Sequence, residues 1–418
     1  MSKFNRLEDL LKLDLTGKKI LLRCDLNVPV KAGKVTDSTR IEGLAPTVEK
    51  LVSKNAKVIL ISHFGRPDGE YDSTYSLSAI VDDVEEIFST VLGKKIPVKF
   101  GVDCIGVAAN EAVNSLKNGG VLILENLRFH KQETKNDQEF SKQLAAHADY
   151  YINDAFSCSH RSHASITGVT AFIPSFAGLL LEKEVECLNK ALKSPERPMS
   201  AIVGGSKIST KIDLLYSLID NSDYIFIGGG MANTFLHAKG VNIGNSLCEK
   251  DLKSKALEIL KKAEAKNCKI LLPIDFSLAK VIDDGRNSSV CNLQTIPTDK
   301  MILDIATQTV IEWSNIISKC KTLIWNGPVG AIEFSPFENG SIALARSVAY
   351  YTKYQNLNSV AGGGDTVALI SQAGLKDSFS YISTAGGAFL EWLEGKELPG
   401  IKALIDCASS ENKKHKAS

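Results

Sequence analysis

Short apolar, β-branched runs recur along the chain, and each ends in glycine or a polar residue before a stretch with helical periodicity. These runs cover residues 18–27, 56–65, 119–128, 148–155, 199–207, 223–231, 269–276, 322–330, 358–366 and 380–388. Apolar strands that alternate with helices predict parallel sheets covered by helices on both faces. Ten strands are more than one open sheet usually contains. We therefore predict an α/β fold with two doubly wound, mostly parallel-sheet, Rossmann-like domains, joined by a helix and separated by a cleft.

The junction between the two predicted domains lies near residue 180. Residues 176–193 carry apolar side chains three to four positions apart, as in an amphipathic helix: Phe176, Leu179, Leu180, Val185, Leu188 and Leu192. Ser194 and the prolines at 195 and 198 end that pattern. We expect an N-terminal domain over 1–175, a connecting helix and hinge over 176–198, and a C-terminal domain over 199–403.

Composition limits the partners of this chain. The 49 Lys and Arg residues and 48 Asp and Glu residues leave a net charge of +1, so no global field attracts nucleic acid or an acidic membrane. No apolar run approaches the length of a membrane span. The nine cysteines are scattered without a CxxC pair, which indicates reduced thiols in the cytoplasm rather than a disulfide framework. We expect a cytoplasmic protein with no nucleic-acid or membrane partner.

Arginine is concentrated in the first half of the chain. Four arginines follow predicted strand ends or lie in the connecting loops: Arg40, Arg66, Arg128 and Arg161. Ligands of open α/β sheets bind at these strand ends, and guanidinium groups suit carboxylate and phosphate. Any one arginine is better explained by a surface salt bridge. Four together favour an anion site, because they would otherwise repel one another.

Two polar motifs of the first half allow more than one interpretation. In RCDLNVP (23–29), strand alternation places Arg23, Asp25 and Asn27 on one side, where they could bind a hydroxyl or carboxylate. A structural Asp–Arg pair followed by a turn is about equally compatible. The spacing of Cys158, His160 and His163 resembles metal ligation, but no second thiol or histidine lies at zinc-site spacing, so we favour loop residues that orient Arg161 or contact an anion.

Glycine-rich turns mark the second half. GGSKISTK (204–211) follows a strand and opens a predicted helix, with Lys207 and Lys211 on one helical face beside an N-terminus that attracts anions. GGGDT (362–366) repeats the arrangement, and its Asp365 could hold Mg²⁺ or cap the helix. STAGGAFLEWLEG (383–395) is the third such turn. The loop NGPVGAIE (326–333) adds Asn326 and Glu333, which could contact a ribose or belong to a surface loop.

The two halves together favour phosphoryl transfer. An arginine cluster suits a small phosphorylated acid, and glycine turns with lysines and a carboxylate suit a nucleotide. Such transfer needs positioning and charge neutralisation more than a nucleophilic side chain. Reactants held on separate domains require closure about the connector.

Ten motifs occur in the order found in the phosphoglycerate kinase family, which the chain resembles over about residues 18–402. They are RCDLNVP, SHFGRP, LENLRF, the His-Arg-x-His loop at 160–163, GGSKISTK, GGGMANTF, LPIDF, NGPVG, GGGDT and GKELPG. The resemblance implies reversible in-line transfer from ATP to 3-phospho-D-glycerate, giving ADP and 1,3-bisphosphoglycerate, as in glycolysis and gluconeogenesis. It also implies Mg²⁺ with ATP or ADP, and a C-terminal segment, 404–418, that returns to the first domain. We further expect a monomer.

The resemblance also assigns residues. Those expected to bind the acid are Asp25, Asn27, Arg40, His63, Phe64, Gly65, Arg66, Arg128 and Arg161. Those expected to bind the nucleotide are Lys207, Lys211, Gly229, Gly230, Asn326, Glu333, Gly363, Gly364, Asp365 and Thr366, with Asp365 at the metal. Those expected to act in transfer are Arg40, Lys207, Lys211, Gly364 and Gly387.

This sequence departs from the family pattern at three places, of which Ala331-Ile332 for a usual Val-Phe is a hydrophobic exchange that should matter little. Ala385 stands where the third turn usually has glycine, which would be strained if the backbone there required a positive φ. Ser157 and Cys158 replace a frequent Gly-Thr. Two rival functions are a catalytically silent nucleotide-binding relative and a kinase of another small carboxylic acid.

Overall fold

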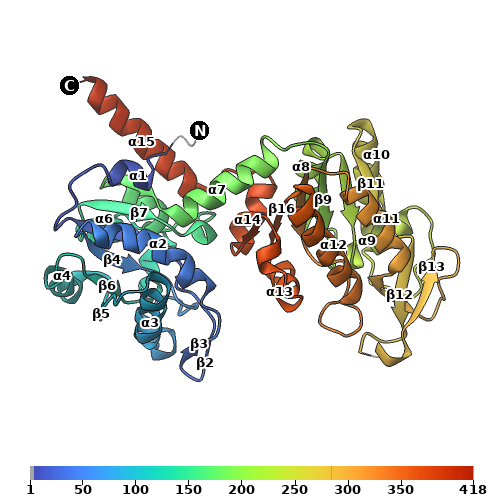
Figure 1. The fold of residues 1–418 in the computed structure, drawn as a ribbon, viewed down its shortest axis with the longest axis horizontal. Helices are drawn as coiled ribbons and strands as arrows, with labels where there is room; N and C mark the ends of the chain where they lie inside the picture. The colour runs from blue at the N-terminus through green and yellow to red at the C-terminus, as the bar shows by residue number, and fades with distance from the viewer. Residues whose placement is uncertain (1–3, 284, 418) are drawn as a thin grey trace. The chain divides into compact units, whose positions relative to one another are not determined.

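The computed structural model describes residues 4–283 and 285–417, which divide into two compact units. One unit comprises Met1–Val185 and Glu397–Ser418, and the other comprises Glu186–Lys396. The chain thus returns to the first unit earlier than the 404 boundary expected from the family pattern. Figure 1 shows the C-terminal helix α15 (Pro399–Ala417) beside the blue and green elements of the first unit.

The first unit is built on a six-stranded parallel sheet of order β5-β6-β4-β1-β7-β8. Its strands are β1 (Lys19–Arg23), β4 (Lys57–Ile61), β5 (Val98–Gly101), β6 (Val121–Leu124), β7 (Tyr150–Asn153) and β8 (Ser175–Ala177), and a short hairpin pairs β2 (Val30–Lys31) with β3 (Lys34–Val35). Its helices are α1 (Leu7–Leu10), α2 (Thr39–Ser53), α3 (Val81–Leu92), α4 (Gly106–Asn114), α5 (Lys131–Thr134), α6 (Gln138–Ala145) and the C-terminal α15, while α7 (Leu179–Leu192) runs from this unit into the second.

Alternate residues of the same strands enter two separate apolar cores in this unit. Ile20 and Leu22 of β1 pack with α2 and α3, whereas Leu21 packs with α4 and α6. The sheet therefore has helices on both faces, as predicted from its continuous apolar strands.

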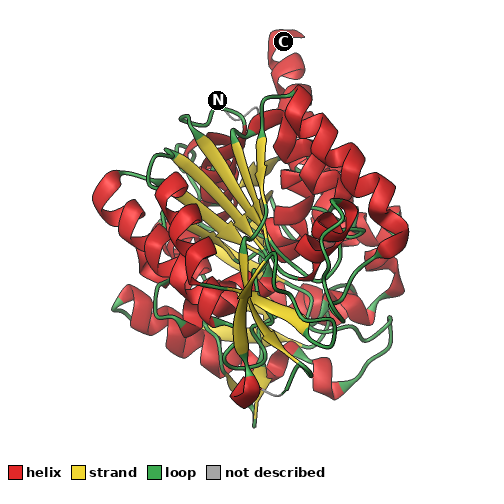
Figure 2. Ribbon diagram, turned by 90° about the vertical axis from the view of Figure 1, so that its right-hand side faces the viewer, coloured by secondary structure: helices red, strands yellow, loops and turns green. Residues whose placement is uncertain are grey.

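The second unit repeats the plan with a six-stranded parallel sheet of order β11-β10-β9-β15-β16-β17. Its parallel strands are β9 (Met199–Val203), β10 (Tyr224–Ile227), β11 (Lys269–Leu271), β15 (Thr322–Asn326), β16 (Asn358–Gly362) and β17 (Tyr381–Ser383), and an antiparallel sheet joins β12 (Asp275–Ala279), β13 (Ser289–Asn292) and β14 (Met301–Ile305). Its helices are α8 (Ile212–Asn221), α9 (Gly230–Ala238), α10 (Lys253–Ala265), α11 (Thr307–Ile317), α12 (Asn339–Gln355), α13 (Gly364–Gln372) and α14 (Gly386–Leu393). Figure 2 shows the strands flanked by helices. The predicted α/β fold of two doubly wound, mostly parallel sheets is confirmed.

Two predicted elements differ from the structure. The helix expected from Phe176 begins only at Leu179, because residues 175–177 pair with β7 as the edge strand β8. The strand expected over 269–276 is two strands in different sheets, since Pro273 between them lacks the N–H that a continuous ladder needs.

A buried carboxyl group lies at the start of α7. Asp154 follows β7, and its Oδ1 accepts a hydrogen bond from the Leu181 amide at 3.0 Å. The Oδ2 atom is buried, and no described residue donates a hydrogen bond to it. Burial raises the pKa of Asp154 to about 6, although hydrogen bonds from Thr47 and the α7 amides act in the opposite direction. The ionised form of Asp154 therefore costs folding free energy.

We expect Asp154 to make the chain less stable as the pH rises. A carboxyl group whose pKa is higher in the folded state stabilises that state when protonated, so its contribution is complete below pH 3.8 and is lost as the pH passes about 6. The difference amounts to about 3 kcal/mol at 1.36 kcal/mol per pKa unit. Urea unfolding at about pH 4.5 and about pH 7.5 tests this by comparison with Asp154→Asn, whose side chain does not titrate. Equal pH dependence in both proteins would contradict it.

Candidate active site

The loop after β1 is held by charged contacts. Asp25 pairs with Arg40 of α2 at 3.0 Å and accepts a hydrogen bond from the Ser157 hydroxyl. Arg40 also donates to the Asn27 carbonyl oxygen at 2.8 Å, and its side chain stays 30% exposed. Because β1 ends at Arg23, Asp25 and Asn27 lie in a loop rather than on the strand alternation we predicted. The structural Asp–Arg pair is present, and it leaves a partly exposed guanidinium at the strand end.

The loop after β4 is tied to its neighbours through main-chain atoms. Asn126 accepts a hydrogen bond from the Phe64 amide at 3.1 Å and donates to the Phe64 carbonyl oxygen at 2.6 Å. Gly65 has φ of +61° and donates its amide to the Asn27 side chain at 2.9 Å. His63 is buried, with Nδ1 at 3.3 Å from the Arg23 guanidinium. The structure thus brings Asn27, His63, Phe64 and Gly65 together.

Three of the four predicted arginines line one pocket of the first unit. This pocket has a volume of about 370 Å³ and is lined by Arg66, Asp68, Gly69, Arg128, His130, Lys131, Thr134, Arg161 and His163. Arg66 is exposed, whereas Arg128 and Arg161 are half-buried. Arg40 lies outside this lining but is joined to it through the loop at Gly65, whose carbonyl oxygen accepts a hydrogen bond from Arg128 at 2.7 Å.

The pocket carries unbalanced positive charge. Burial, together with the neighbouring Arg161 and Arg23, lowers the pKa of Arg128 to about 10. Its Nε atom is buried and has no hydrogen-bond partner among the residues that the structure describes. Burial and the guanidinium groups of Arg128, Arg161 and Arg23 also lower the pKa of His163 to about 4, so this imidazole is neutral. An anion in the pocket would relieve the repulsion among these guanidinium groups.

Beneath the pocket lies a buried ionic network that the sequence analysis missed. The Arg23 Nε donates to the Ser165 hydroxyl at 2.9 Å, and that hydroxyl donates to Glu133 at 2.6 Å. The second Glu133 oxygen accepts the Ser165 amide at 2.9 Å, and Glu133 is fully buried. Arg23 was singled out only as part of the β1 alternation, and the sequence held no signal for its link through Ser165 to a residue 110 positions away.

Asp25, His63 and Cys158 place potential metal ligands within 4.8 Å of one another. Burial and the guanidinium groups of Arg23, Arg128, Arg161 and Arg40 lower the pKa of His63 well below its ordinary value. A cation is disfavoured in such surroundings, so this group belongs to the anion-binding region.

In the second unit, the turn after β9 differs from the prediction. Helix α8 begins only at Ile212, so Lys207 and Lys211 do not lie on one helical face. Gly204 is pressed against the 327–328 segment, where a Cβ would come within 1.9 Å of the Pro328 carbonyl oxygen, and Gly205 has φ of +132°. The buried Ile208 anchors an irregular loop between these glycines and the helix. Lys207 is exposed, whereas Lys211 is half-buried.

Asn326 connects this loop to the turn after β16. Its Oδ1 accepts a hydrogen bond from the Lys211 ammonium group, and its Nδ2 donates to the Gly362 carbonyl oxygen at 2.9 Å. Thr366 accepts the Gly327 amide at 2.7 Å. Gly363 has φ of +98°, and a Cβ there would lie 2.8 Å from Asn326. Burial lowers the pKa of Lys211, whereas Glu394 and Asp365 act to raise it.

Helix N-termini at the strand ends of this sheet are open to solvent. Gly364 and Asp365 begin α13, Gly386 and Gly387 begin α14, and all four are exposed. Gly229 and Gly230 lie at the start of α9, where the Met231 amide donates to the Gly205 carbonyl oxygen at 3.0 Å. Glu333 is exposed, and within the described residues it forms no ion pair or hydrogen bond with the other predicted nucleotide-binding residues.

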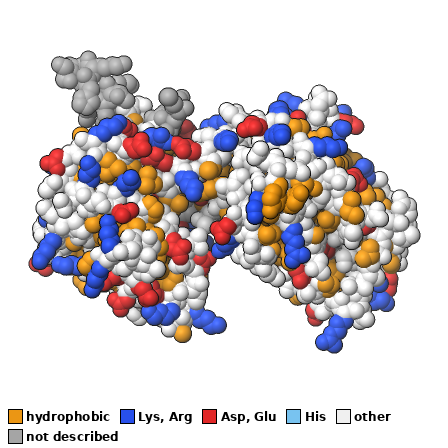
Figure 3. Space-filling view, in the orientation of Figure 1, with side chains coloured by type: hydrophobic (Ala, Val, Ile, Leu, Met, Phe, Trp, Pro, Cys, Tyr) orange, Lys and Arg blue, Asp and Glu red, His pale blue; other side chains and the backbone are white. Residues whose placement is uncertain are grey.

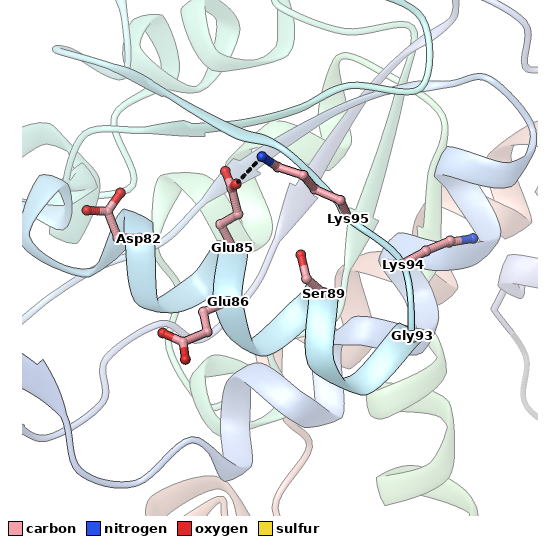
Figure 4. Close-up of a pocket in the computed structure, with 7 residues that line it drawn as sticks. All are labelled: Asp82, Glu85, Glu86, Ser89, Gly93, Lys94 and Lys95. Atoms are coloured by element: carbon pink, nitrogen blue, oxygen red, sulfur yellow. Dashed lines mark ion pairs between the residues drawn. The ribbon is translucent and has the colours of Figure 1, made fainter.

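A larger surface hollow of about 650 Å³ lies on α3, apart from all of these residues. Figure 4 shows Glu85 beside Lys95, 3.9 Å apart, with Asp82 and Glu86 on the same helix. Its acidic lining does not suit phosphate groups. On the face shown in Figure 3, acidic and basic side chains are interspersed, so charge is not segregated over that face.

Comparison with known proteins identifies the family. The family model for phosphoglycerate kinase matches residues 9–396. The chain belongs to the phosphoglycerate kinase family. A phosphoglycerate kinase of Bradyrhizobium diazoefficiens is 51% identical over 96% of this chain and 99% of its own length, and one of Methylorubrum extorquens strain PA1 is 49% identical over 97% and 99%. The solved phosphoglycerate kinase of Coxiella burnetii has a TM-score of 0.86 at 38% identity, covering 97% of this chain and 100% of that one.

Membership of the phosphoglycerate kinase family makes the chain an ATP-dependent phosphotransferase. Neither rival function, a silent relative or a kinase of another acid, is favoured by these comparisons. The substitution at Ala385 causes no backbone strain, because φ there is −100°. No helix within the described residues combines the length and apolar character needed to span a bilayer.

Proposed function

We propose that the first unit binds 3-phosphoglycerate, that the second binds ATP or ADP with Mg²⁺, and that the γ-phosphoryl group passes directly between them. The observation that carries the assignment of the acid is the pocket at Arg66, Arg128 and Arg161. Burial, together with the neighbouring Arg161 and Arg23, lowers the pKa of the Arg128 guanidinium to about 10, which shows how closely the positive charges are gathered. A phosphate group carries the charge and the acceptor oxygens that this pocket lacks.

In this proposal the pocket holds the phosphate that the acid already carries. Asp25, Asn27 and His63, with the loop at Phe64 and Gly65, orient its hydroxyl and carboxylate. The lowered pKa keeps His63 neutral, so it contributes hydrogen bonding rather than charge. Arg40 neutralises charge on the group in transfer.

The glycine turns of the second unit receive the nucleotide phosphates. The exposed N-termini of α13 and α14 offer free amides at Gly364 and Gly387, and anions bind readily at such ends. Lys207 and Lys211 supply positive charge, and the ammonium group of Lys211 is positioned by its hydrogen bond to the Asn326 Oδ1. Gly229 and Gly230 have no side chains, so the nucleotide can approach the backbone there closely. Gly363, with its positive φ, forms the turn after β16, and Thr366 stabilises the end of that turn. Glu333 contacts the ribose.

The residues at α13 fit a magnesium ion. Asp365 is exposed in the first turn, and no donor among the described residues hydrogen-bonds to its carboxylate. Mg²⁺ usually binds one or two carboxylates together with phosphate oxygens. When bound there, the ion would neutralise phosphate charge while Asp365 holds it beside the turn.

The chemical step needs no nucleophilic side chain. A carboxylate oxygen of 3-phosphoglycerate forms the new bond to the γ-phosphorus, the bond from that phosphorus to the β-phosphate oxygen breaks, and ADP leaves with the electron pair. Arg40, Lys207, Lys211 and the turn amides stabilise the spreading negative charge. Because the acid and nucleotide residues belong to different units, we propose that the units act as the two substrate domains and must approach each other about the connector.

A coupled assay tests the proposal. We expect turnover with 3-phosphoglycerate and Mg-ATP, and very little with unphosphorylated glycerate, which leaves the arginine pocket empty. Absence of turnover with 3-phosphoglycerate would support a silent nucleotide-binding protein, and equal use of glycerate would remove the role assigned to the pocket. We also propose a cytoplasmic, monomeric enzyme of glycolysis and gluconeogenesis.

Replacing Arg66 with alanine is expected to raise the KM for 3-phosphoglycerate by about ten- to a hundredfold, while the KM for ATP changes little. A hydrogen bond to a charged group contributes about 1.5–3 kcal/mol, and 1.4 kcal/mol is tenfold in affinity. Steady-state kinetics with each substrate varied measures the two constants. Arg346→Ala, which removes an exposed arginine of α12, is the control. A change confined to ATP would show that the substrate assignments are reversed.

A further inference from the structure

A thiol, an imidazole and a carboxylate meet beside β5, and of the three residues only His130 also lines the arginine pocket. Asp103 and Cys104 lie between β5 and α4, and His130 is the residue before α5. One ligand atom from each side chain lies within 4.8 Å of the other two. The three residues come from loops that the sheet order places together, since β5 and β6 are neighbours.

We propose that Asp103, Cys104 and His130 form a binding site for a zinc-type divalent cation, with water as the fourth ligand. Thiolate sulfur, imidazole nitrogen and carboxylate oxygen are the ligands that Zn²⁺ takes, and three protein ligands with one water is a common arrangement. The site is separate from the magnesium proposed at Asp365, which lies in the other unit.

Contacts around the three residues hold them in place. The Asp103 Oδ1 accepts the Cys104 amide at 2.6 Å and lies 2.8 Å from the His130 Nε2, while no described residue donates to Oδ2. The His130 ring packs against Phe140 with ring centres 5.3 Å apart. His147 contacts the backbone of Cys104, with its Nε2 at 3.1 Å from the Cys104 carbonyl oxygen. Such partners orient metal ligands before an ion arrives.

The surroundings of the thiol are acidic. Burial raises the pKa of Cys104, and the carboxylates of Asp103, Glu133 and Glu125 raise it further. The same carboxylates attract a divalent cation. The group at Asp25, His63 and Cys158 has similar ligands but lies among four arginines, so electrostatics separates the two clusters and favours the one at Cys104.

Two of the three ligands are open to solvent. The side chain of Asp103 is 41% exposed and that of His130 is 25% exposed, whereas Cys104 is fully buried, so an ion first meets the carboxylate and the imidazole. On binding, the Cys104 S–H bond breaks, a metal–sulfur bond forms, and the proton passes to the solvent. The charge of the ion does not change, so no oxidant or reductant is required.

Titration of the full-length chain with Co²⁺ tests the proposal, because a cobalt–thiolate bond gives a near-ultraviolet charge-transfer band. We expect one such band that saturates at one ion per chain and that Zn²⁺ removes, with release of about one proton per ion. Cys104→Ser should abolish the band. His130→Gln and Asp103→Asn should weaken binding at least about tenfold, since even outer partners of a metal contribute ten- to a hundredfold.

Cys158→Ser is the matched control, because it removes the thiol of the other cluster and should leave the band intact. If circular dichroism shows that Cys104→Ser does not fold, the proposal is tested by the loss of cobalt affinity in His130→Gln and Asp103→Asn. Absence of a band in the unmodified chain would overturn the proposal. So would a band that persists in all three Asp103, Cys104 and His130 variants, or one that only Cys158→Ser removes.

Discussion

Replacing Arg40 with alanine should lower kcat by about a hundredfold or more, which is the usual cost of removing one donor that faces charge developing in a transition state. Arg40 is suited to that role because its Nη1 is fixed by Asp25 at 3.0 Å and by the Asn27 carbonyl oxygen at 2.8 Å, while nearly a third of the side chain remains exposed. The affinity for ATP should be preserved, since Arg40 belongs to the other unit.

Steady-state kinetics in the direction of 1,3-bisphosphoglycerate formation measures this effect. Arg40→Lys keeps the charge but loses the planar fork, so it should recover only part of the lost rate. Arg346→Ala should behave as the unmodified enzyme. A kcat within a factor of about three of normal in Arg40→Ala would remove Arg40 from the transfer step, because removing such a donor costs far more.

Replacing Glu133 with alanine should reduce the free energy of unfolding by about 3–5 kcal/mol, because it removes two hydrogen bonds to a buried carboxylate, each contributing about 1.5–3 kcal/mol. Glu133 is fully buried and accepts both the amide and the hydroxyl of Ser165, through which it supports the buried Arg23. Its loss would leave the Arg23 guanidinium buried close to the positive pocket with no counter-charge at that position.

Urea unfolding followed by circular dichroism measures the loss. Glu133→Gln keeps the shape and one acceptor, so it should cost less than the alanine variant. Glu111→Ala, which removes an exposed carboxylate of α4, should stay within about 0.5 kcal/mol of the unmodified chain. A loss below about 1 kcal/mol in Glu133→Ala would mean that Arg23 is balanced by other groups or by water, because a buried unpaired charge costs several times more.

Patterns local in sequence predicted the fold well. Most parallel strands lie inside the apolar runs identified from hydropathy, because strands buried on both faces must be apolar throughout. These strands are β1, β4, β6, β7, β9, β10, β15, β16 and β17. The arginine assignment also rested on local information, since parallel strands bring their carboxyl ends to one edge of the sheet. Arg66, Arg128 and Arg161 accordingly line a single pocket.

Errors arose where a distant segment decided the local structure. Phe176 fits a helical pattern, but pairing with Ile152 makes it part of an edge strand. Lys207 and Lys211 have helical spacing, but contact of Gly204 with the 327–328 segment keeps the chain irregular until Ile212. In both cases backbone contacts with a remote segment outweigh a weak local preference.

The sequence by itself determined the alternation of strands and helices, the two sheets, and the residue types at the sheet edges. It could do so because the positions of buried apolar residues repeat over a few residues along the chain. Only the tertiary structure decided which charges face each other. Three features depend on distances between residues remote in sequence: the link from Arg23 through Ser165 to Glu133, the gathering of Arg66, Arg128 and Arg161 at one pocket, and the meeting of Cys104 with His130. Electrostatic and coordination chemistry act through those distances, and no local pattern of residues records them.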